Sequence, residues 1–73
     1  MTALRAVTAE EQQPATLEEL VIEELRIFDA TALEIAADLG APVTRVRRIL
    51  ARAAIRNQVI RYNDGRHWVW KIA

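Results

Sequence analysis

The stretch "GAPVTRVRRILARA", residues 40–53, combines a helix start, an apolar repeat and four arginines. Gly40 adopts positive φ at little cost and ends what precedes it, while Pro42 suits the first turn of a new helix. We predict that this helix spans about residues 42–56 and ends near Asn57, a residue that tolerates a left-handed cap. Four apolar residues recur at helical spacing and are expected to face a core: Val46, Ile49, Leu50 and Ala53. The exposed side carries Arg45, Arg48, Arg52 and Arg56.

Two further helices are predicted before this one, each opened by a capping box. Thr16-x-x-Glu19 and Thr31-x-x-Glu34 both have the hydroxyl and carboxylate that satisfy the first amides of a helix. The first helix, about residues 17–28, has an apolar face of Leu17, Leu20, Val21, Leu25 and Phe28. The second is short and runs through Leu33, Ala36 and Leu39. Because "LGAP" then leads into the arginine-rich helix, the spacing is that of a helix-turn-helix.

The end of the chain changes to a strand pattern. "QVIRYN" and "RHWVWKI" are rich in strand-forming residues, and the "DG" between them indicates a two-residue hairpin turn. Trp68, Trp70 and Ile72 alternate onto one face, where Trp68 is expected in the core and Tyr62 in a structural role. Ala30 and Thr31 can add a minimal third strand. The order predicts an α+β winged helix over residues 16–73, three helices plus a C-terminal hairpin wing, after a flexible lead-in over residues 1–15.

The charges are divided between the two halves of the chain. Residues 1–38 carry nine acidic and two basic residues, a net charge of −7. Residues 39–73 carry eight basic residues and one acidic residue, a net charge of +7. Such asymmetry points to nucleic acid or another polyanion as a partner. The alternative is attraction between the halves of a monomer.

Several classes of protein are excluded by the composition. The 73 residues allow one small domain, no apolar run reaches the roughly 20 residues that span a bilayer, and no signal-peptide pattern is present. No cysteine and no serine occur, and His67 is the only histidine, so we expect no enzyme activity, no catalytic residue, no metal site and no cofactor. The lack of cysteine fits a cytoplasmic protein.

The arginine-rich segment and the end of the chain also resemble a known superfamily. "LGAP" before the helix, the run "VRRIL" and the closing "WKI" are similar to the winged helix-turn-helix superfamily across about residues 16–73, and within it to Zalpha-type domains, which bind left-handed nucleic acid. In that type the third helix presents an asparagine, a basic residue and a tyrosine. Its wing brings a proline pair and a tryptophan.

The resemblance maps unevenly onto this chain. The basic position falls on Arg48 and the wing tryptophan on Trp70. The asparagine and tyrosine positions are Arg47 and Ala51, and the proline pair falls on His67 and Trp68. The resemblance implies the fold and a general nucleic-acid function, and it leaves the handedness of the ligand open.

These observations predict a protein that binds double-stranded DNA, specific for a sequence or a structure. We expect the helix over residues 42–56 to enter the major groove and the hairpin over residues 58–72 to act as the wing. Arginine suits guanine edges or phosphates, and a basic wing suits the backbone. The candidate nucleic-acid-binding residues are Thr44, Arg45, Arg47, Arg48, Arg52, Arg61, Arg66 and Trp70.

The biological role and the partner stay open at this point. A bacterial or phage transcriptional regulator is one hypothesis, and a recombination or replication accessory factor is another. A winged helix that docks an acidic protein partner, or one that binds Z-form nucleic acid, is the alternative. Ile22 and Ile27 lie off the main apolar face of the first helix, which suggests a homodimer or protein partner through residues 17–28.

Overall fold

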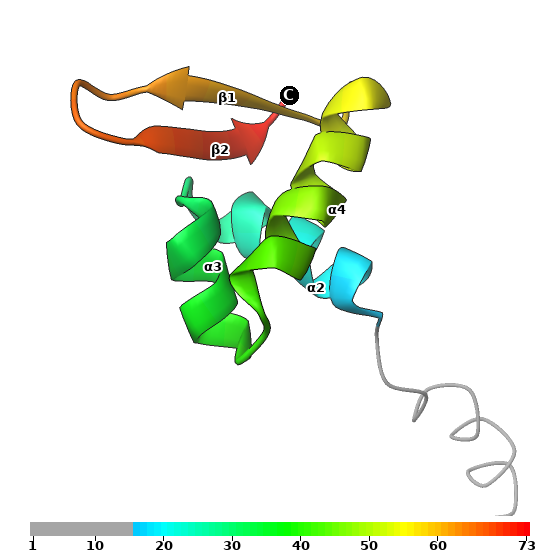
Figure 1. The fold of residues 1–73 in the computed structure, drawn as a ribbon. Coiled ribbons are helices and arrows are strands. Elements are labelled where there is room, and N and C mark those ends of the chain that lie inside the picture. Colours follow the sequence, from blue (N-terminus) through cyan, green and yellow to red (C-terminus); the bar gives the residue numbers. More distant parts are fainter. Residues whose placement is uncertain (1–15) are drawn as a thin grey trace, which may run out of the picture.

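The computed structural model describes residues 16–73, so the flexible lead-in predicted for residues 1–15 lies outside the described part. In chain order the elements are α2 (Leu17–Ile27), α3 (Ala32–Leu39), α4 (Val43–Ile55), β1 (Val59–Asn63) and β2 (Trp68–Ile72) (Figure 1). The two strands pair antiparallel and lie across one end of the helices. Three helices followed by a hairpin confirm the predicted α+β winged helix.

Both predicted capping boxes are present. The Thr16 hydroxyl accepts a hydrogen bond from the Glu19 amide at 3.2 Å, and the Glu19 carboxylate accepts one from the Thr16 amide at 3.1 Å. Thr31 and Glu34 repeat this arrangement at the start of α3, at 3.1 and 2.8 Å. Each box satisfies amides that the first turn of a helix leaves without partners. The local sequence therefore fixes where α2 and α3 begin.

The ends of α3 and α4 also follow the sequence. Gly40 has φ 65° and closes α3 in the left-handed conformation, and Pro42 directly precedes α4. Asn57, one residue after the Arg56 cap, has φ 61°, as predicted for a left-handed residue at this end. These caps leave a short connection between α3 and α4, which is the turn of the helix-turn-helix.

The hairpin turn differs from the prediction by one residue. Asn63 pairs with Trp68, which places Gly65 and Arg66, rather than Asp64 and Gly65, at the centre of the turn. The Asp64 carboxylate accepts hydrogen bonds from the amides of His67 and Arg66, at 2.8 and 2.9 Å. The side chain of Asp64 thus bonds the backbone of the turn and favours the register in which Asn63 pairs with Trp68. The Asp-Gly dipeptide alone does not predict this register.

A single bridge ties the hairpin to the helices at Ala30. The Ala30 amide donates to the Trp70 carbonyl at 3.1 Å, and the Trp70 amide donates to the Ala30 carbonyl at 2.8 Å. The predicted minimal third strand is therefore present as one residue pair. It anchors the middle of β2, while the turn of the hairpin projects past the helices (Figure 1).

The core lies between the helices and one face of the hairpin. Its largest fully buried side chains are Ile35, Leu50, Val21, Val46 and Val59. The four residues of α4 predicted to face inward are all buried: Val46, Ile49, Leu50 and Ala53.

Three other expectations about the core are wrong. Leu33 is 64% exposed and Ile35 is buried in its place, because a spacing of three residues from Leu33 to Ala36 fits more than one face of a short helix. In α2 only Val21 and Leu25 of the predicted face are fully buried. Trp68 is 52% exposed, because the hairpin extends beyond the helices that would cover it.

No helix within residues 16–73 is long and apolar enough to cross a membrane.

A pair of carboxylates links α2 to α3 and gives a first prediction. A hydrogen bond with Asp38, together with lost hydration and the Asp38 charge, raises the pKa of Glu24. Because the folded-state pKa is raised, the stability from this pair is present at acid pH and is lost as the pH rises through that pKa. Above that pKa the Glu24 carboxylate is charged and no longer donates a hydrogen bond to Asp38.

We expect Glu24→Gln to raise the melting temperature at neutral pH, because the amide donates to Asp38 without charge. The gain should disappear in mildly acidic buffer, which thermal unfolding followed by circular dichroism will measure. Glu23→Gln is the matched control, because the exposed Glu23 already pairs with Arg26 at 3.2 Å and should gain nothing. An equal gain in both variants would contradict the role of Asp38.

Candidate nucleic-acid interface

The arginines of α4 lie on two different edges of the helix. Arg45, Arg48 and Arg52 line one hollow together with the start of α2. Arg47 is exposed on the other edge, where the helical period sets it between Val43 and Ala54, both half-buried against the core. The structure therefore brings Arg45, Arg48 and Arg52 together and separates Arg47 from them. Thr44 is exposed in the first turn of α4.

The edge next to α2 forms a small basic hollow. Its volume is about 290 Å³, and its lining is Thr16, Leu17, Glu18, Arg45, Arg48, Ile49 and Arg52. Glu18 is the only carboxylate in this lining, and it lies 3.7 Å from the guanidinium of Arg52. Arg45 and Arg48 have no carboxylate partner within residues 16–73. Two guanidinium groups thus remain available for a phosphate or a base edge.

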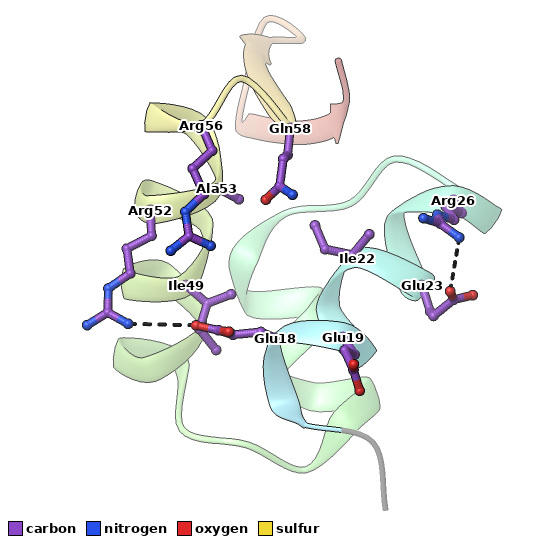
Figure 2. Close-up of a pocket in the computed structure, with 10 residues that line it drawn as sticks. All are labelled: Glu18, Glu19, Ile22, Glu23, Arg26, Ile49, Arg52, Ala53, Arg56 and Gln58. Carbon is purple, nitrogen blue, oxygen red and sulfur yellow. Dashed lines mark hydrogen bonds and ion pairs between the residues drawn. The ribbon is translucent and has the colours of Figure 1, made fainter. Parts of the chain in front are cut away.

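A larger groove of about 510 Å³ runs between α2 and the second half of α4 (Figure 2). Ile22, Ile49 and Ala53 form its apolar part, so Ile22, predicted off the core, lines this groove half-buried. Figure 2 shows Arg52 and Arg56 along the α4 side and glutamates along the α2 side. The mixed charges make this groove a poor site for a polyanion, in contrast to the smaller hollow.

The first turn of α4 is open to anions. It contains no acidic residue, and Pro42 supplies no side-chain hydrogen bond to its amides. The positive end of the helix dipole adds to the charge of Arg45 and Arg47. The predicted leading end of the helix therefore combines basic side chains with the positive end of the helix dipole.

The wing carries a stack that the sequence did not predict. The guanidinium carbon of Arg61 lies 4.6 Å from the centre of the Trp68 ring and 5.8 Å from that of Trp70. Arg61 pairs with Trp70 in the strand register, and Trp70 is half-buried against the core. The observed register sets Arg61 directly opposite Trp70 and diagonal to Trp68, all three on one face of the hairpin.

The turn of the wing adds one further exposed basic residue, Arg66. Hydrogen bonds from the amides of His67 and Arg66 lower the pKa of Asp64, so its charge is used within the turn. On the opposite face of the hairpin, the Tyr62 hydroxyl donates to the Asp29 carboxylate at 2.9 Å, which raises the pKa of Tyr62. Tyr62 has the structural role that the sequence favoured.

Within residues 16–73, no group of three or more histidine, aspartate or glutamate side chains is arranged to hold a metal ion.

Comparisons with known proteins identify the family. No family model matches the sequence, and no curated protein matches it. The similar solved structures include two Zalpha domains. The Zalpha domain of PKZ from Carassius auratus, solved in complex with Z-DNA, is 31% identical with a TM-score of 0.71, and the match covers 78% of this chain and 92% of that chain. The ORF112 Zalpha domain of Cyprinid herpesvirus 3, solved bound to Z-DNA, is 27% identical with a TM-score of 0.70, covering 82% of this chain and 100% of that chain. By fold, extent and identity, this chain belongs to the Zalpha family of winged helix domains.

Proposed function

We propose that this chain is a non-enzymatic DNA-binding domain that uses the N-terminal half of α4 and the wing. One observation carries the proposal: residues 43–72, which form α4 and the hairpin, contain eight basic side chains and a single acidic one. The basic residues are Arg45, Arg47, Arg48, Arg52, Arg56, Arg61, Arg66 and Lys71. The single acid among them, Asp64, is engaged by backbone amides.

The family supports the same ligand class, because both similar domains were solved bound to Z-DNA. In the proposed complex α4 enters a groove with its first turns, and the wing lies along the backbone. We expect the acidic residues of α2 to face away from the phosphates, apart from Glu18, which lies in the basic hollow and pairs with Arg52. Such a domain suits a cytoplasmic transcriptional regulator, or a recombination or replication accessory factor, from a bacterium or phage.

A salt titration tests the proposal directly. Phosphate neutralisation releases counterions, so the logarithm of the affinity falls linearly with the logarithm of the salt concentration. For about four phosphate contacts we expect a slope of about −4, measured by fluorescence anisotropy on labelled duplex DNA. Absence of binding in low-salt buffer would rule the proposal out.

Z-form DNA is a second candidate ligand, favoured by the two similar complexes. The sequence resemblance adds Arg48 and Trp70 at the positions of the basic residue and the wing tryptophan. The expected result is conversion of an alternating CG duplex to the left-handed circular dichroism spectrum on addition of the protein. Saturating binding with an unchanged right-handed spectrum would leave general DNA binding as the function. The experiment is informative because Arg47 and Ala51 stand where Zalpha-type domains present an asparagine and a tyrosine.

A protein partner is the alternative that the outer side of α2 favours. Ile27 is 74% exposed and Phe28 is exposed beside it, so residues 17–28 offer apolar surface for a homodimer or another protein. The α4 arginines would then dock an acidic partner. Light scattering at increasing concentration tests the homodimer, and a pull-down that recovers one protein and no nucleic acid would favour the protein partner.

A further inference from the structure

The outer half of the wing presents an aromatic ring where a core residue was expected. Trp68 is 52% exposed, and Asn63 stands opposite it in the last residue pair before the turn. Directly opposed residues of an antiparallel pair lie on the same face, and alternate residues share it. Trp68 therefore lies on the face that, at the other end of the hairpin, packs Val59 and Ile72 against the helices.

Arg61 packs against this ring and places a positive charge next to it. Its guanidinium lies over Trp68 at 4.6 Å and reaches Trp70 at 5.8 Å, within the range of a cation–π interaction. No ion pair engages Arg61 within the described residues 16–73. Because the guanidinium covers one side of the ring, the exposed part of Trp68 is an oriented aromatic surface backed by an unneutralised positive charge.

We propose that Trp68 and Arg61 form a stacking site for an unpaired nucleobase. A base offers a π-face to an aromatic ring, and its phosphates offer negative charge to arginine, so one nucleotide satisfies both features. A base within an intact duplex presents only its edge to the wing. The preferred ligand is therefore DNA with an exposed base face, such as a bulge or a single-stranded segment. This inference rests on the proposed DNA-binding function.

The chemistry of the site argues against other aromatic-site ligands. A methylated ammonium or a basic peptide would meet the Arg61 charge, which already occupies the cationic position over the rings. The turn adds Arg66 and keeps its single acid bound to backbone amides. An anionic ligand with a flat ring matches this environment.

The test compares one duplex with the same duplex carrying a single extra unpaired adenine at its centre. With the full chain, anisotropy should show tighter binding to the bulged duplex by about five- to hundredfold, the range expected for one stacked base. Trp68→Ala should remove this preference and keep binding to the plain duplex with an unchanged salt slope. Ile60→Ala is the matched control, because Ile60 is exposed to a similar degree on the opposite face of the same hairpin.

A spectroscopic readout is independent of affinity. The chain has two tryptophans, so the difference in emission between the unchanged protein and Trp68→Phe reports on Trp68, and this emission should be quenched by the bulged duplex and not by the plain one. Equal affinities for both duplexes, with Trp68 emission unchanged, would overturn the stacking site while leaving DNA binding intact. Failure to bind either duplex would overturn both proposals.

Discussion

Replacing Leu50 by alanine is expected to unfold a large fraction of the domain. Leu50 is fully buried in α4, and removing a buried leucine side chain costs about 2–5 kcal/mol of the free energy of unfolding. A domain of this size has roughly 3–9 kcal/mol in total, at about 0.05–0.15 kcal/mol per residue. The melting temperature should therefore fall by about 10–30 °C, as each kcal/mol corresponds to about 4–8 °C. Circular dichroism at increasing temperature measures the change.

Ile55→Ala provides the matched control on the same helix. Ile55 is 82% exposed, so its truncation should change the free energy of unfolding by less than about 0.5 kcal/mol. If the two variants melted at the same temperature, the assignment of the inward face of α4 would be wrong. A different face of α4 would then point toward the core, and a different set of side chains would be exposed at the candidate interface.

The second large effect concerns DNA affinity. We expect the double substitution of Arg47 and Arg48 by alanine to weaken duplex binding by about 10- to 100-fold and to flatten the salt slope by about two units. Both side chains lie in the first half of α4, and the first turn of this helix contains no acidic residue. Fluorescence anisotropy over a range of salt concentrations gives both quantities.

The double substitution of Arg52 and Arg56 by alanine removes the same charge from the same helix. Arg52 pairs with Glu18, and both arginines line the mixed-charge groove against α2, so we expect only a severalfold loss. A larger loss from this second pair would move the interface to the α2 side of α4. The ratio of the two effects thus locates the DNA along the helix.

Local sequence predicted most of the helical fold because the determining groups are close in the chain. Capping boxes act over three residues, and Gly40 and Asn57 act through their own backbone angles. The apolar repeat of α4 extends over enough turns to define one face. In α3 the same method failed at Leu33, because eight residues give too few repeats to distinguish neighbouring faces.

The candidate site was less predictable because it depends on contacts between distant segments. The helical period already separates Arg47 from the other arginines of α4, but only the packing of α2 shows that Arg45, Arg48 and Arg52 line one hollow. The Arg61 stack depends on how the guanidinium extends across the strands to Trp68 and Trp70, which residue type does not specify. Residue type indicated a ligand class, whereas the arrangement of the candidate side chains required the three-dimensional structure.

The bridge between Ala30 and Trp70 divides the wing into parts that can diverge at different rates. At the end of the hairpin away from the turn, Val59 is buried in the core and Ile72 packs against it, so folding limits which residues can replace them. Beyond the bridge, residues 63–68 project past the helices and carry little of the core packing. The outer segment is therefore less constrained by folding than the inner part, so substitutions there should leave the domain beneath intact.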